Sequence, residues 1–183
     1  SLRGHGGSDG GKHLTACRIS DYVDDVKSVA EKLDGRPIIV GHSMGSLVAL
    51  SAAARYPDHA RSLALIGTTA PMRVHPDMMA SAQKNDHDVI DMITYWGYSK
   101  SAQLGGNENP GMWMAGSTLR LLEKAKENVI HCDLKACENY ATGLEHAKLV
   151  RCPTLFILGD RDIMTPMRAA QKMVDVMSDA RVC

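Results

Sequence analysis

The segment 36–57, RPIIVGHSMGSLVALSAAARYP, constrains the fold more than any other part of this chain. Its short apolar run at 37–40 is typical of a strand that is buried on both faces of a sheet. Gly41 and Gly45 follow, and an alanine-rich apolar stretch then ends at Pro57, which cannot continue a helix. The pattern predicts a strand that passes through a tight turn into a closely packed helix, which is a unit of an α/β sheet.

The serine within this turn has the setting of a nucleophile. A hydroxyl must stand clear of the backbone so that a base can take its proton, and glycines two residues before and after a serine permit such a turn. Gly41-His42-Ser43-Met44-Gly45 meets that demand, and the helix that follows directs its N–H groups at the serine. Ser43 is therefore the candidate nucleophile, and the Met44 N–H a candidate oxyanion-hole donor. The alternative is a turn serine that only caps the helix.

Strand and helix signals alternate at both ends of the chain. An apolar stripe at residues 19–33 predicts a helix. Apolar runs at residues 61–67 and 154–159 predict two more buried strands, and a fourth strand is predicted to begin at residues 180–183. Thr165-Pro166 predicts the N-cap and first position of another helix. The alternation predicts an α/β fold with a parallel sheet and helices on both of its faces.

The middle of the chain, residues 71–145, shows no convincing buried strand. Helices are predicted at 76–84, 87–96, 112–128 and 131–144. We expect a helical cap here, inserted between core segments 1–70 and 146–183. Six methionines between residues 72 and 114 either line a pocket for a moderately hydrophobic small substrate or join the cap helices.

Composition limits the partners. Lys plus Arg and Asp plus Glu both number 21, so the net charge is zero, and no basic run suits nucleic acid. No stretch is long and apolar enough to span a membrane, and a cytoplasmic location is expected. Five cysteines without a C-x-x-C pair favour reduced thiols. His131, Cys132 and Cys137 have poor spacing for zinc, and no metal or other cofactor is expected.

Three segments resemble the α/β-hydrolase family. LRGHGGSD is similar to that family's loop after the fourth core strand, GHSMGS to its nucleophile elbow after the fifth, and CPTLFILGDRDIMTP to the acid-bearing segment after the seventh. The resemblance covers both ends of the chain, while the middle is similar only as a helical cap. It implies a Ser, Asp or Glu, His triad in that chain order, with the pocket between core and cap.

Two acids compete for the orienting role in GDRDIMTP. The family pattern places the acid three residues after the glycine, which indicates Asp162, whereas Asp160 serves the loop or faces solvent. A carboxylate in a turn beyond a buried strand can hold the tautomer of an imidazole. The alternative for Asp162 is a turn or capping role ahead of Thr165.

The family's base is a histidine that follows the acid, and residues 163–183 contain none. All eight histidines precede Asp162: His5, His13, His42, His59, His75, His87, His131 and His146. His5 is expected to be structural, and His42 to point away from Ser43. We expect a fragment with little activity, whose catalytic histidine lies beyond Cys183 and whose second oxyanion donor precedes the chain.

The resemblance implies a serine hydrolase that forms an acyl-enzyme from a small ester, lactone or related acyl substrate. Three alternatives remain open on the same fold: a C–C bond hydrolase, a cofactor-free haloperoxidase, and a ligand-binding protein without catalysis. The sequence identifies no substrate-binding residues and leaves the oligomeric state open.

Overall fold

The computed structural model describes residues 1–8, 18–106, 109 and 111–183, which contain a four-stranded parallel sheet with strand order β1-β2-β3-β4. The strands are β1 (Ile38–His42), β2 (Ser62–Ile66), β3 (Thr154–Ile157) and β4 (Ala180–Val182). All four lie where apolar runs predicted them. The predicted α/β class with a parallel sheet is confirmed.

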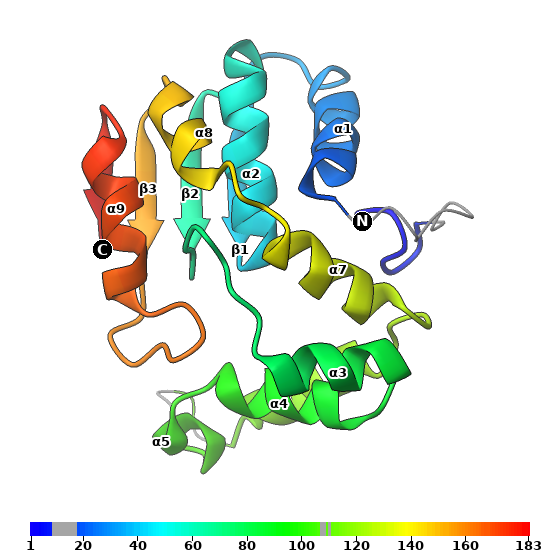
Figure 1. The fold of residues 1–183 in the computed structure, drawn as a ribbon. Coiled ribbons are helices and arrows are strands. Elements are labelled where there is room, and N and C mark those ends of the chain that lie inside the picture. The colour runs from blue at the N-terminus through cyan, green and yellow to red at the C-terminus, as the bar shows by residue number, and fades with distance from the viewer. Residues whose placement is uncertain (9–17, 107–108, 110) are drawn as a thin grey trace.

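One face of the sheet carries the helices of the predicted core (Figure 1). They are α1 (Ile19–Ala30), α2 (Met44–Arg55), α8 (Gly143–Leu149) and α9 (Met167–Val176), with the short 3₁₀ helix η1 (Pro57–His59) after α2. α2 packs on β1 and β2 and lies between α1 and α8. The core beneath these helices is fully buried and includes Leu50, Leu65, Phe156 and Met173. This apolar layer fixes the positions of the strand ends.

The opposite face of the sheet is open to solvent over the described residues. Ile38 and Val40 are each 61% exposed, and Leu155 and Ile157 are 39% and 38% exposed. Register places Val40 beside Ala64, and Ala64 beside Leu155, so these side chains share one face. The expectation of helices on both faces is therefore corrected, because the described core helices all pack on the other side.

A second group of helices lies beyond the carboxyl ends of the strands (Figure 1). It comprises α3 (Pro76–Lys84), α4 (Asp88–Trp96), α5 (Lys100–Gln103), α6 (Met114–Leu122) and α7 (Val129–Glu138). α3 and α4 match their predicted ranges. The prediction at 131–144 is wrong in its extent, because α7 ends at Glu138 and α8 starts at Gly143. A Cβ on Gly143 would lie 2.4 Å from the Cβ of Ala70, so only glycine fits where this second helix begins.

None of the helices in the described part of the chain is both long enough and apolar enough to cross a membrane.

Candidate functional site

The turn between β1 and α2 has the geometry of a strained strand-to-helix connection. Ser43 adopts φ 52° and ψ −124°, a left-handed conformation that side-chain-bearing residues rarely adopt, and its N–H donates to the Ile66 carbonyl at 3.0 Å. A Cβ on Gly41 would lie 2.1 Å from the Gly45 carbonyl oxygen. A Cβ on Gly45 would meet nothing within 4 Å among the described residues. The backbone around Gly41 thus leaves no room for a side chain, whereas the described surroundings of Gly45 do.

A buried pair of hydroxyls braces this turn. Ser46 is fully buried, and its Oγ donates to the Ser43 carbonyl oxygen at 2.6 Å. The same hydroxyl hydrogen bonds with Thr68 Oγ1 at 2.7 Å, which ties the start of α2 to the segment after β2. Met44 is the first residue of α2, so its N–H has no acceptor within the helix and is available to a ligand.

The segment after β3 holds Asp162 firmly. Its Oδ1 accepts hydrogen bonds from the N–H groups of Met164 at 2.9 Å and Thr165 at 2.8 Å, and its Oδ2 accepts one from Thr165 Oγ1 at 2.7 Å. The Asp160 side chain is 81% exposed and lies 3.6 Å from the guanidinium of the neighbouring Arg161. The two acids therefore differ, since Asp162 is fixed within the turn after β3 and Asp160 faces solvent.

Gly67 supports this carboxylate, although its role was not predicted from the sequence. It has φ +52°, and a Cβ there would lie 3.2 Å from Thr165 Oγ1 and 3.5 Å from Asp162 Oδ2. A glycine directly after a buried strand, at the same sheet edge as Ser43, is the signal that could have found it. The prediction for Thr165 is wrong, because Pro166 is the N-cap of α9 and the Thr165 hydroxyl binds Asp162 instead.

A cavity of about 440 Å³ brings the predicted residues together at the carboxyl ends of the strands. Ser43, Met44 and Asp162 all line it. His42 lines it too. The apolar side chains that line the rest of the cavity are Met72, Val74, Met78, Ile93, Leu122, Ile130, Leu134 and Met164. They give the cavity a largely apolar lining.

The methionines of the middle segment serve both suggested purposes. Met72 and Met78 line the cavity, whereas Met92 packs in the cluster that joins the helices around Val89. Met78 serves both purposes, because it lines the cavity and is also buried in that cluster.

No histidine within the described residues hydrogen bonds to Asp162. His5 contacts Asp133, His146 contacts the Tyr140 hydroxyl, and His87 contacts Asp91 and Glu123. Burial lowers the pKa of His146. His13 lies outside the described residues. The described site therefore has a candidate nucleophile and a candidate acid without a histidine that connects them.

The cysteines differ from the expectation of reduced thiols in one case. Cys137, Cys152 and Cys183 are free, but Cys132 is disulfide-bonded. Cys17 lies outside the described residues. Cys137 lines the cavity, where burial raises its pKa to about 12, so this thiol is neutral near pH 7 and is a poor nucleophile.

Comparison with known proteins identifies the family. A family model described as serine aminopeptidase, S33 (Hydrolase_4) matches residues 2–182. The chain belongs to this α/β-hydrolase family. Among curated proteins, it is 44% identical over 68 residues to a 2-(acetamidomethylene)succinate hydrolase of Mesorhizobium japonicum. The match covers 37% of this chain and only 24% of that relative, so the two are comparable over about a quarter of the relative's length.

Solved structures show the same α/β-hydrolase fold. An enol-lactonase from Burkholderia xenovorans superposes with a TM-score of 0.84 at 20% identity and covers all of this chain, which spans 69% of that protein. A thermophilic esterase superposes with a TM-score of 0.79 at 23% identity, and the chain spans 68% of it. At such identities these likenesses establish the fold alone.

Proposed function

We propose that this chain carries the nucleophile and the acid of a serine hydrolase for small, moderately hydrophobic ester, lactone or related acyl substrates. The observation that supports this most is the shared cavity of Ser43 and Asp162, which approach it from different strand ends and are surrounded by apolar side chains. We also propose residues 71–145 as the cap and residues 1–70 and 146–183 as the core. The substrate then lies between the two parts.

In the proposed reaction, Ser43 Oγ attacks the carbonyl carbon while a histidine takes its proton. The Met44 N–H, at the start of α2, donates to the oxyanion that forms. Asp162, which lines the same cavity, orients the imidazole. Collapse of the tetrahedral intermediate gives an acyl-enzyme, which water then hydrolyses. We assign the imidazole to a residue outside those the structure describes.

The relatives support the substrate class through their names. The neighbours include an esterase and an enol-lactonase, and the curated relative is a hydrolase of 2-(acetamidomethylene)succinate. An ester and an enol lactone both present a carbonyl carbon to a nucleophile. A cavity with a presented serine and an apolar lining fits that shared chemistry.

A fluorophosphonate probe tests the nucleophile, and imidazole in the buffer supplies a base. Mass spectrometry is expected to locate the label on Ser43, with on the order of tenfold faster labelling when imidazole is present, because general bases contribute strongly to such attacks. Ser43→Ala is expected to remove the label.

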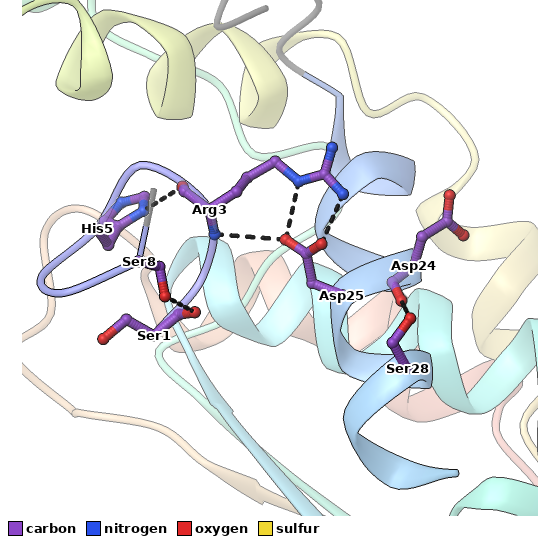
Figure 2. A network of polar contacts seen from close by, with 7 residues as sticks. All are labelled: Ser1, Arg3, His5, Ser8, Asp24, Asp25 and Ser28. Atoms are coloured by element: carbon purple, nitrogen blue, oxygen red, sulfur yellow. Dashed lines mark hydrogen bonds and ion pairs between the residues drawn. The ribbon is translucent and has the colours of Figure 1, made fainter. Parts of the chain in front are cut away.

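Ser28→Ala is the matched control. Ser28 is an exposed serine of α1 that donates to the Asp24 carbonyl (Figure 2), outside the cavity, so its loss should leave labelling unchanged. Labelling that survives Ser43→Ala, or that never reaches Ser43 in imidazole, would contradict the proposed nucleophile and favour a ligand-binding protein without catalysis.

A further inference from the structure

One wall of the cavity combines apolar side chains with a carboxylate that the proposed reaction does not use. Ile130, Asp133, Leu134 and Cys137 line the cavity from α7. Their spacing of three, one and three residues places them on a single helix face. Asp133 is thus a charged group on a face that otherwise suits an apolar substrate.

Asp133 is held by two other elements. Its Oδ2 lies 2.7 Å from His5 Nε2, in the N-terminal loop, and its Oδ1 accepts a hydrogen bond of 2.6 Å from the Tyr22 hydroxyl of α1. Tyr22 is 2% exposed, and neither Tyr22 nor His5 lines the cavity. The carboxylate is therefore fixed from behind, and its side chain remains 20% exposed.

The contacts of His5 determine its protonation. His5 Nδ1 lies 3.0 Å from the Arg3 carbonyl oxygen, which can only accept (Figure 2). A neutral imidazole donates from one nitrogen, so both contacts are satisfied only by the imidazolium. The hydrogen bond with Asp133 raises the pKa of His5, and burial raises the pKa of Tyr22. Two donors thus face the Asp133 carboxylate.

A carboxylate offers about four acceptor positions, and the two described donors occupy one on each oxygen. Positions remain for a ligand on the side that lines the cavity. A half-buried acceptor of this kind favours ligands with a matching donor, because a ligand without one displaces water from the carboxylate and supplies no hydrogen bond in its place.

From this geometry we infer that Asp133 is a specificity-determining residue, which selects acyl substrates that carry an N–H or O–H donor away from the scissile carbonyl. The inference rests on the proposed function, because it concerns the same cavity. It narrows the substrate class from plain alkyl esters to acyl compounds with a hydrogen-bond donor, such as an acylamino or hydroxyl group.

The test compares two ligands of the same shape, methyl 4-acetamidobutanoate and methyl 4-acetoxybutanoate, which differ in an N–H group against an ester oxygen at a position away from the methyl ester carbonyl. Both are titrated by ligand-observed NMR into the full chain with Ser43→Ala, so neither ligand is consumed. The amide is expected to bind about tenfold more tightly, the usual effect of a hydrogen bond to a charged group. Asp133→Leu is expected to bring the ratio of the two affinities close to one.

Leu134→Ala is the control for the cavity wall, since Leu134 follows Asp133 on α7 and lines the same cavity. It should weaken both ligands and leave their ratio unchanged. Tyr22→Phe should lower the unfolding midpoint and keep the preference for the amide. If Asp133→Leu does not fold, Asp133→Asn is used instead, and the ratio of the two ligand affinities is expected to fall several-fold.

Equal affinities in the parent chain, an unchanged ratio in the Asp133 variants, or no binding of either ligand would overturn the inference. Because every sample lacks the Ser43 hydroxyl, these results do not depend on whether Ser43 is a nucleophile. Failure of the proposed function would appear only in the fluorophosphonate experiment.

Discussion

At the scale of single residues, the two glycines of the G-x-S-x-G motif have unequal roles. Gly41 lies so close to the backbone of Gly45 and Ser46 that any side chain would displace it, with Ser46 Cα 2.8 Å from an added Cβ. Gly45 lies inside α2 with open space around it. The first glycine therefore enforces the turn, while the second follows it without a packing constraint from the described residues.

We predict that Gly41→Ala lowers the free energy of unfolding by about 3 kcal/mol or more, the range of changes that overpack a rigid site. Gly45→Ala, a matched change four residues away, is expected to be neutral or to stabilise by about 0.5–1 kcal/mol, because alanine favours helices over glycine. Urea unfolding of both variants measures the difference. Equal effects of the two changes would show that the close approach at Gly41 has been misjudged.

The motif allowed Ser43 and Asp162 to be predicted, because short-range patterns encode a strand end and the turn that follows it. The supports of these residues were not predicted. Gly67 follows β2, far earlier in the chain than Asp162, so its place after a buried strand could indicate the sheet edge but not its contact with Asp162. Asp133 was missed for the same reason, since its partners lie in two other segments.

At the scale of elements, the pair of His5 and Asp133 joins the N-terminal loop to α7, and Arg3 joins the same loop to α1. Arg3 Nε and Nη2 contact the Asp25 carboxylate at 2.9 and 2.6 Å (Figure 2). This hydrogen-bonded pair lowers the pKa of Asp25. Arginine keeps its charge as pH rises and histidine does not, so the two connections should respond differently to pH.

We predict that the contribution of His5 to stability is fully present below its unfolded pKa, about 6.5, and is lost as pH rises through its raised folded pKa. The groups that face His5 are Asp133 of α7, Tyr22 of α1 and the N-terminal amine. Urea unfolding between about pH 5.5 and 9 should show a larger loss of stability in the parent chain than in His5→Gln. Parallel pH profiles would contradict this assignment.

Periodic elements were the most predictable part of the fold. The four strands, α3 and α4 follow from apolar runs and helical spacing, which depend on neighbours in the chain. The division between α7 and α8 depends on the close approach of Gly143 to Ala70. The exposure of the Val29 side chain near the end of α1 depends on which helices pack nearby. Such boundaries follow from tertiary packing, which overrides local propensity.

At the scale of the whole molecule, the open sheet face is the most unusual property of the described chain. Val40 of β1 stands beside Ala64 of β2, which stands beside Leu155 of β3, and Ile38 stands beside Ser62 on the same face. Contiguous apolar surface of this kind favours association or dye binding, and β1 is also an edge strand with an unpaired side in the described sheet.

We predict that the chain binds the dye ANS and self-associates as its concentration rises, measured by fluorescence and sedimentation velocity. Val40→Thr keeps the β-branched shape and should reduce both effects. Ile163→Thr is the control, because Ile163 is 69% exposed but lies in the loop after β3, away from this face. A chain that stays monomeric and does not increase ANS fluorescence would show that this face of the sheet is covered.

The helices α3 to α7 follow β2 in the sequence. Helix α8 then leads to β3, which is the strand that pairs directly with β2. An insertion between paired strands leaves and rejoins the sheet within a short distance, so its length and sequence can change with little effect on the core. Ser43 precedes this insertion and Asp162 follows it. The helices that line much of the cavity can therefore vary in length and sequence, while the proposed nucleophile and acid keep their positions at the strand ends.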